Sequence, residues 1–155
     1  MAAARPGSMP LAGERIEGLT LGARALTQLR LGIEALAGRE AAQAMTVVLH
    51  LHKGQCDAAL GDLVNRGFYG LDKANVFIIV QDKQKGFKFD PISRHFAEVG
   101  SEADPDQQQF CCSLGAGYGM MQMGWVADAF TLDDSGAQHI LKGTLLEELK
   151  IRGAE

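Results

Sequence analysis

The hydrophobic positions in the first half of the chain change between the period of a helix and that of a strand. Apolar residues recur at three- and four-residue steps over 26–36, which predicts a helix of about four turns that ends near Gly38. The run 44–51 is continuously apolar and rich in β-branched residues, so it predicts a central strand that is buried on both faces. The helical period returns over 59–64, and 75–81 then gives the strongest strand pattern in the chain. This alternation predicts an α/β fold in which helices cover a parallel sheet.

The second half of the chain has a weaker pattern. Phe87 and Phe89 alternate with charged or small residues and predict a short edge strand, whereas the polar run 101–109 predicts an exposed loop. A further strand is predicted over 109–113. The sequence Asp-Asp-Ser-Gly at 133–136 is typical of a turn, and we favour that reading over a cation site.

The two ends of the chain differ in pattern. Residues 1–14 show neither a helical nor a strand period and predict a disordered tail, and 15–155 has about the size of one domain, ~150 residues. Thr144 and Glu147 have the spacing of a capping box, which predicts a last helix that runs almost to the end. Because every earlier helix leads back into the sheet, we expect the domain 15–155 to be cut at its carboxyl end.

Composition and charge exclude several classes of partner. Of the 155 residues, 46% are hydrophobic and 22% are charged, which is typical of a globular protein. With 15 Lys and Arg against 19 Asp and Glu the net charge is −4, so we expect no nucleic-acid or membrane partner. No apolar stretch approaches the ~20 residues of a membrane span, and the start has no apolar signal region. We therefore expect a cytoplasmic protein.

The cysteines and histidines give no pattern of a disulfide framework or a zinc site. The three cysteines are odd in number, and Cys111 and Cys112 are adjacent, so we expect reduced thiols in a cytosol-like compartment. Cys56 and the histidines lack metal-ligand spacing, so no metal site is expected from them. His50 and His52 share one face of their strand by its period of two, and we interpret both as structural.

Two features have the chemistry of a ligand site. Gln81 stands at the carboxyl end of a buried strand, where open α/β sheets bind ligands, so its amide either caps the strand or contacts a ligand. The segment 115–119 (Gly-Ala-Gly-Tyr-Gly) lets the backbone approach a phosphate or a flat base, but it lacks the spacing of known phosphate loops and equally fits a plain turn. The methionines that follow, with Trp125, predict packing, and Lys53 predicts a solvated side chain.

Several segments carry a resemblance when they are taken in chain order. The chain has Leu-Val-Asn-Arg-Gly-Phe-Tyr-Gly-Leu at 63–71, Asn-Val-Phe at 75–77 and then Gln81. Further on it has Gly-Tyr-Gly at 117–119 and a Leu- and Glu-rich helix over 143–155. This series resembles the family of UTP-dependent sugar 1-phosphate uridylyltransferases, which includes the UDP-glucose and UDP-sugar pyrophosphorylases. In that family a helix ends in a Phe-Phe-Gly-Leu-like turn, a strand leads to a Gln, and a Gly-His-Gly follows.

The resemblance covers about residues 16–155 and implies a partial nucleotidyltransferase domain with a Rossmann-like, GT-A-like sheet covered by helices. In such enzymes a sugar 1-phosphate attacks the α-phosphorus of UTP and releases pyrophosphate, usually with Mg²⁺ between the phosphates. The family's pattern implies that Gln81 contacts the uracil and that Gly117 leaves room for the base and ribose. Tyr118 replaces the family's histidine and is the third residue implied at the uridine.

The family's nucleotide loop, a Gly-Gly-rich turn followed by a basic residue, has no counterpart in this sequence. In the family that loop precedes all the segments seen here, so the resemblance implies that 15–155 is truncated at its amino end as well and thus at both ends. Without the loop the triphosphate has no amide cradle, so we expect a fragment or divergent member that is inactive alone. One alternative is a noncatalytic α/β interaction module derived from this fold. Another is an unrelated Rossmann-like protein that binds a different nucleotide. The family also leaves a plastid location open as the alternative to the cytoplasm.

Overall fold

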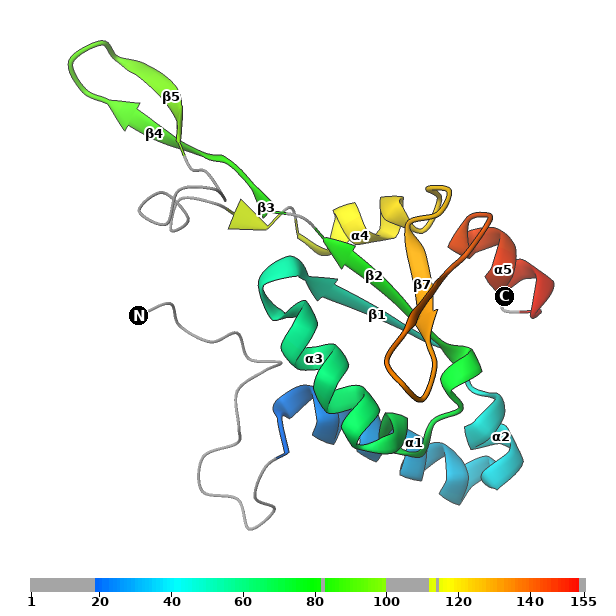
Figure 1. Ribbon diagram of the computed structural model, residues 1–155. Helices are drawn as coiled ribbons and strands as arrows, with labels where there is room; N and C mark the ends of the chain where they lie inside the picture. Colours follow the sequence, from blue (N-terminus) through cyan, green and yellow to red (C-terminus); the bar gives the residue numbers. More distant parts are fainter. Residues whose placement is uncertain (1–18, 82, 100–111, 114, 154–155) are drawn as a thin grey trace.

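The computed structural model describes residues 19–81, 83–99, 112–113 and 115–153, in which helices surround a sheet of short strands (Figure 1). Within these ranges no helix combines the length and the apolar character needed to cross a membrane. The elements in chain order are α1 (Leu21–Ala37), α2 (Arg39–Ala44), β1 (Val47–His52), α3 (Lys53–Asn65), η2 (Gly67–Gly70), η3 (Lys73–Asn75), β2 (Val76–Gln81), β3 (Lys83–Gln84), β4 (Gly86–Asp90), β5 (His95–Val99), β6 (Cys112–Ser113), α4 (Ala116–Gln122), β7 (Ala129–Leu132), β8 (Gln138–Ile140) and α5 (Leu145–Ile151).

A four-stranded sheet in the order β1-β2-β7-β8 forms the centre of the molecule. β1 and β2 run parallel in a register that extends from Val47 opposite Val76 to His52 opposite Gln81. β7 runs antiparallel to β2, and β8 runs antiparallel to β7. The prediction of an α/β fold is confirmed, but the sheet is mixed and the prediction of a parallel sheet holds only for its first pair of strands.

β1 lies at the edge of this sheet, so the prediction of a central strand buried on both faces is wrong. Among the described strands only β2 pairs with it. Val47 and His52 at its ends are buried, whereas the positions between them are half-buried or, at His50, exposed. A short apolar run indicates that a strand packs against neighbours, but it does not reveal how many strands flank it.

Helices cover both faces of the sheet, and β2 divides the core between them. Val76 and Ile78 belong to a cluster with residues of α3 and the turn after it, whereas Phe77 and Ile79 belong to a cluster with Leu145 of α5. All of these side chains are buried. Each contributes roughly 1.5–3 kcal/mol through removal of apolar surface from water. Both layers therefore pack around β2, which explains why its sequence pattern is the strongest.

The first helix ends at Gly38 as predicted but begins at Leu21, earlier than the predicted 26, and the last helix begins at the predicted cap. The Thr20 side chain accepts a hydrogen bond from the Ala23 N–H (3.2 Å) before α1, and Gly38 ends that helix with φ of +89°. At α5 the Glu147 N–H donates to Thr144 Oγ1 (3.1 Å), and the Thr144 N–H donates to Glu147 Oε2 (2.9 Å). The predicted capping box is confirmed.

The turn after α3 is left-handed over four consecutive residues. From Gly67 to Gly70 the φ values lie between +54° and +78°. Phe68 and Tyr69 adopt this conformation although it costs a residue with a side chain roughly 1–2 kcal/mol. Phe68 is buried in the core, and the Tyr69 hydroxyl donates to Asp62 Oδ2 at 2.6 Å. These two anchors hold the strained turn in place.

The predicted turn at 133–136 connects β7 to β8 and is confirmed. Asp133 Oδ1 accepts hydrogen bonds from the N–H groups of Ser135 (2.8 Å) and Ala137 (2.9 Å). An aspartate that binds the backbone two and four residues ahead stabilises a turn by itself. Lys73 forms an ion pair with Asp134 on the same connection.

β4 and β5 form a hairpin that runs out from the sheet, and β3 pairs with β6 in a separate short ladder (Figure 1). Phe87 and Phe89 lie on β4, so the short strand predicted there is confirmed, whereas its partner β5 was not expected from the sequence. The loop predicted over 101–109 lies outside the described residues, as does most of the strand predicted over 109–113.

Candidate functional site

The carboxyl ends of the two parallel strands bring together side chains from distant parts of the chain. Gln81 ends β2, and it is paired in register with His52 at the end of β1. α4 lies beside these strand ends and contacts β2 (Figure 1). Open α/β sheets bind ligands outside the carboxyl ends of their strands, so we take this edge as the candidate site.

Gln81 meets the glycine-rich segment directly. Its side-chain Nε2 donates a hydrogen bond to the backbone carbonyl oxygen of Gly115 at 3.0 Å. Gln81 is only 3% exposed, whereas Gly115 and Gly117 are exposed. The structure therefore brings the predicted residues together, with the glutamine amide buried and the glycines at the surface.

The glycine-rich segment begins a helix, so the alternative of a plain turn is wrong. Gly115 is the N-cap of α4 with φ of +83°, and the helix starts at Ala116. An added Cβ on Gly117 would meet nothing within 4 Å, so this glycine borders open space. The Tyr118 ring packs edge-on against Trp125, with centroids 5.2 Å apart. Of the residues implied at the uridine, Gly117 is open to solvent and Tyr118 already has an aromatic partner.

Gly119 makes the closest approach between α4 and the sheet. A Cβ built on this residue would lie 2.0 Å from Cε1 of His50 and 2.3 Å from both of its ring nitrogens. No side chain fits there while the imidazole keeps its place. The approach brings Nε2 of His50 to 3.4 Å from Oε1 of Gln122.

Gln122 is a buried amide that ties α4 to β2 and to the segment before β7. Its Nε2 donates to the Val80 carbonyl oxygen (3.2 Å) and to Asp128 Oδ2 (2.9 Å). Both partners are acceptors, which fixes the amide orientation and turns Oε1 toward His50. Because Oε1 only accepts, Nε2 of His50 donates, and a neutral His50 then has its lone pair on Nδ1.

Sequence reasoning missed Gln122 and Asp128. Gln122 is the one strongly polar side chain within the apolar run from Met120 to Val126. A lone amide in such a run is usually buried with a partner, so this was the available signal. The identity of its partners depends on the position of α4 over the sheet, which no local pattern encodes.

The two histidines of β1 have different surroundings. His52 is buried, and its Nδ1 accepts a hydrogen bond from the Gly54 N–H at 3.1 Å, which caps α3. Its structural interpretation is confirmed. His50 is exposed and belongs to the network of Gln122, so its structural interpretation stays a prediction.

The methionines around α4 do not all pack as predicted. Met123 packs against the core cluster of β2 and α5. Met120 and Met121 are 73% and 64% exposed, and Trp125 is 41% exposed. The prediction of packing is therefore wrong for Met120 and Met121, because α4 directs only part of its circumference toward the sheet.

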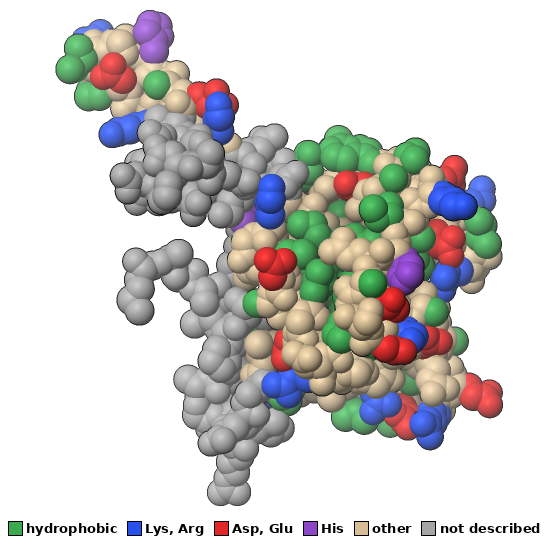
Figure 2. All heavy atoms as spheres, in the orientation of Figure 1, with side chains coloured by type: hydrophobic (Ala, Val, Ile, Leu, Met, Phe, Trp, Pro, Cys, Tyr) green, Lys and Arg blue, Asp and Glu red, His purple; other side chains and the backbone are tan. Residues whose placement is uncertain are grey.

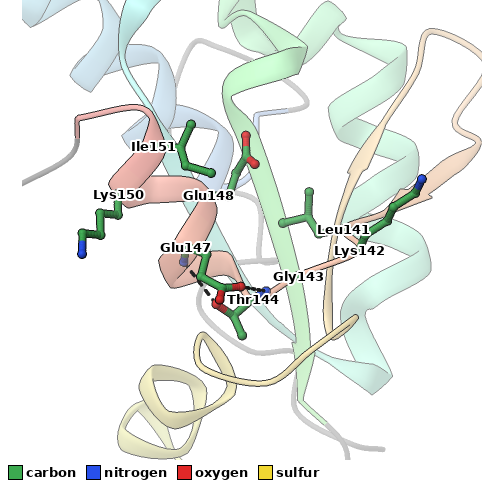
Figure 3. Close-up of a pocket in the computed structure, with 8 residues that line it drawn as sticks. All are labelled: Leu141, Lys142, Gly143, Thr144, Glu147, Glu148, Lys150 and Ile151. Carbon is green, nitrogen blue, oxygen red and sulfur yellow. Dashed lines mark hydrogen bonds between the residues drawn. The ribbon is translucent and has the colours of Figure 1, made fainter.

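A hollow of about 450 Å³ lies beside the start of α5 (Figure 3). The polar groups of Thr144 and Glu147 at its wall are bonded to each other in the capping box, as the dashed lines in Figure 3 show. The hydrogen bond from the Thr144 backbone lowers the pKa of Glu147 below its usual value. Thr144 and Glu147 at the wall of this hollow therefore already have hydrogen-bond partners in each other. The hollow is lined by Leu141, Lys142, Gly143, Thr144, Glu147, Glu148, Lys150 and Ile151.

A second hollow of about 260 Å³ lies between α1, α3 and β1, with Leu26, Leu49 and Leu60 among its mostly apolar lining. Asp62 and Tyr69 stand at its wall. Burial raises the pKa of Asp62, but the hydrogen bonds from Tyr69 and Arg66 outweigh it, so this pKa lies below its usual value. Burial and the bond to Asp62 together raise the pKa of Tyr69. These groups satisfy one another and hold the left-handed turn.

The described part of the chain contains no group of three or more His, Cys, Asp or Glu side chains that could hold a metal ion. Near the strand ends, Asp128 already accepts a hydrogen bond from Gln122. The described residues near the strand ends therefore do not form a ligand set for the Mg²⁺ that the resemblance implies. Cys56 is a half-buried free thiol, and burial raises its pKa.

The chain was compared with known proteins in three ways. No model of a protein family matches it, and neither a curated protein nor a solved structure matches it. The resemblance to uridylyltransferases is therefore supported by short sequence segments alone, and the candidate site is defined by the geometry of the strand ends.

Proposed function

We propose that the chain is a uridine-nucleotide-binding α/β domain related to the UTP-dependent sugar 1-phosphate uridylyltransferases. The observation that carries this proposal is the hydrogen bond between Gln81 and Gly115. It joins Gln81, which the resemblance implies at the uracil, to the backbone two residues before Gly117, which the resemblance implies at the base and ribose. We place the pyrimidine at the exposed start of α4, next to Gly117.

The surroundings of Gln81 suit a base that carries carbonyl oxygens. Its Nε2 donates to the Gly115 carbonyl in this structure, and a uracil carbonyl is the same kind of acceptor. A carbonyl oxygen of a bound uracil would replace the Gly115 carbonyl oxygen as the acceptor. The Gln81 amide would then have a hydrogen-bond partner both with and without the ligand. Such an exchange avoids the roughly 1–3 kcal/mol that a buried, unpaired donor costs. The open space at Gly117 gives the flat ring room to approach the backbone.

Our proposal for this chain alone is binding and not transfer. Uridylyl transfer requires a sugar 1-phosphate oxygen aligned with the α-phosphorus of UTP, and neutralisation of the phosphate charge. The family's loop for that purpose has no counterpart in the sequence. Mg²⁺ would be held by the triphosphate oxygens, which it prefers as ligands, because the described residues contain no group of His, Cys, Asp or Glu side chains that could hold it. Transfer of the uridylyl group to a sugar 1-phosphate would therefore take place only in a protein that also has the nucleotide loop.

Calorimetric titration of the full chain with UTP and UDP-glucose, with CTP and ATP as comparison, tests the proposal. We expect selective binding of the uridine nucleotides. Gln81→Met keeps the side-chain volume but removes the donor, so it should abolish the selectivity. Gln138→Met changes an exposed glutamine of β8 and is the matched control.

Gly117→Phe tests the site without a change in the core. An added Cβ there meets no atom within 4 Å, so the variant should fold and its ring should cover the proposed base site. Loss of uridine binding in this folded variant supports the proposal. Equal binding of all four nucleotides, or unchanged uridine binding in both site variants, would refute it.

The noncatalytic interaction module is the second candidate, and a specific observation favours it. Apolar side chains gather at the surface over α4 and on the β4–β5 hairpin (Figure 2). Monomeric proteins rarely expose large contiguous apolar patches without a binding role. A stable protein complex formed by a chain with no nucleotide affinity would favour this candidate over the first.

A further inference from the structure

The β4–β5 hairpin carries aromatic side chains on one of its two faces. Phe89 stands opposite Phe96 in the antiparallel register, and Phe87, two residues before Phe89, stands opposite Glu98, so the three rings share a face that also carries the Glu98 side chain, which is paired with Lys85. The rings of Phe89 and Phe96 lie 5.3 Å apart. Phe87, Phe89 and Phe96 are 71%, 49% and 71% exposed. We call these three residues the Phe face.

A second exposed apolar surface lies over α4 and the start of α5. A Cβ on Gly124 would stand 3.8 Å from Leu146 Cδ1, and the Leu146 N–H donates to the Met123 carbonyl, so Leu146 lies against the segment after α4. Figure 2 shows apolar side chains on the body in this region. We call this the Met/Trp surface; its exposed members are Met120, Met121, Trp125, Val126 and Leu146.

We propose that the chain forms a two-fold dimer by arm exchange, in which the Phe face of each copy docks on the Met/Trp surface of the other. The hairpin runs out from the sheet, so its aromatic face is available to a second molecule (Figure 1). The Met/Trp surface begins on α4, the same helix whose start carries the proposed base site, but the proposed contact uses side chains other than Gln81 and Gly117 and is measured without nucleotide.

The area of the two surfaces favours a reciprocal contact. Three phenylalanines with these exposures offer about 400 Å², given that an aromatic side chain buries roughly 150–250 Å². One hairpin on one surface would then remove about 800 Å² from both sides together, which is the size of a weak contact. Two such contacts related by a two-fold axis bury about 1,600 Å², which is the size of a standard stable interface.

The chemistry of the two surfaces is also complementary. Methionine is flexible and polarisable, so it adapts its shape to an aromatic ring and makes favourable sulfur–ring contacts. Phenylalanine rings on a short hairpin are comparatively rigid and lose little side-chain entropy on docking. The adaptable methionines are therefore on the Met/Trp surface, and the rigid rings are on the Phe face.

Sedimentation velocity of the full chain over a range of concentrations measures the dimer. We expect Phe87→Ser/Phe96→Ser and Met121→Lys each to shift the equilibrium to monomer by at least tenfold in the dissociation constant. Each changes exposed side chains, so the fold should persist, which circular dichroism verifies. Ile92→Ser at the 92%-exposed hairpin tip and Leu36→Ser on the 90%-exposed end of α1 are the matched controls, with no expected effect.

Mixing the two defective variants distinguishes arm exchange from other dimers. The Phe87→Ser/Phe96→Ser chain keeps an intact Met/Trp surface, and the Met121→Lys chain keeps an intact Phe face. The mixture should therefore form one of the two contacts and associate more tightly than either variant alone. A dimer of Met/Trp surfaces against each other would show no such recovery.

A mixture that shows no recovery overturns the proposal, and so do three further outcomes. The first is a wild-type chain that stays monomeric at every concentration. The second is a dimer that both defective variants leave intact. The third is a monomer that binds phosphatidylcholine–phosphatidylserine vesicles through the Phe face, since that result would assign the hairpin to a lipid surface.

Discussion

The imidazole ring of His50 fills the space that a side chain on Gly119 would need, because an added Cβ would lie 2.0 Å from its Cε1. This contact lets α4 come close to the sheet and places Gln122 within hydrogen-bond reach of Val80. Glycine in a helix costs about 1 kcal/mol relative to alanine. The chain therefore gives up helix stability at this position in return for a close approach beside the candidate site.

Gly119→Ala should destabilise the protein, whereas Gly117→Ala should not. The first variant places a methyl group on the His50 ring, and overpacking of this kind costs about 1–3 kcal/mol. The second adds a methyl group in open space and should raise the free energy of unfolding by up to about 1 kcal/mol. Urea denaturation of both variants measures the difference. Similar effects of the two substitutions would contradict the proposed contact.

Removal of the imidazole should relieve the effect of Gly119→Ala. In a His50→Ala background the added methyl group has no ring to meet, so the loss in the free energy of unfolding should shrink. We expect a coupling energy of about 0.5–3 kcal/mol in this double-mutant cycle, which is the range for residues in contact. A coupling near zero would mean that the penalty arises from the helix itself.

Tyr69 should ionise at a higher pH than an ordinary tyrosine. Burial raises its pKa, and the hydrogen bond to the Asp62 carboxylate raises it further. The chain has two tyrosines, so absorbance titration of Tyr118→Phe reports on Tyr69 alone. We expect no phenolate signal near pH ~10, the ordinary value, in the folded protein. A normal titration in the native state would show that the bond to Asp62 is not formed.

The raised pKa of Tyr69 should make the folded protein lose stability at alkaline pH. Because the folded state raises the pKa of Tyr69, its contribution is fully present below the unfolded pKa of ~10 and is lost as the pH rises through the folded value. Tyr69→Phe should cost about 1 kcal/mol at neutral pH and flatten this alkaline loss. Thermal melts from neutral to strongly alkaline pH compare the two proteins, and parallel curves would contradict the linkage.

The parts of the fold that the sequence predicted are those determined locally. β2 carries apolar residues toward both layers, so its continuous run is visible in any window. The capping box of α5 depends on the side chains of Thr144 and Glu147, which are only three residues apart. The turn at Asp133 likewise forms from its own carboxylate and the next few backbone groups.

The parts that escaped prediction depend on contacts between distant segments. Nothing within β1 reveals that only β2 pairs with it among the described strands, and nothing within β7 reveals that it runs antiparallel to β2. The glycines of α4 disfavour a helix by propensity, yet the helix forms because Gly119 fits against His50 and Gln122 finds buried partners. Tertiary contacts outweighed propensity at this point, and the same contacts define the candidate site.

Gln122→Glu should be among the most damaging substitutions near the candidate site. It replaces the two N–H donors by a carboxylate that faces the Val80 carbonyl and the Asp128 carboxylate. An unpaired buried charge costs about 3 kcal/mol or more. The new carboxyl group should have a raised pKa in the folded state, so stability should be lost as the pH rises through that value and regained in acid.

Urea denaturation at several pH values tests this sign against a matched control. Gln138→Glu makes the same chemical change on an exposed strand and should alter the free energy of unfolding by less than about 0.5 kcal/mol. A Gln122→Glu variant that is as stable as this control at neutral pH would mean that Gln122 does not bind Asp128 in solution. A loss that persists unchanged in acid would mean that shape, and not charge, limits this position, because a protonated carboxyl group can again donate one hydrogen bond.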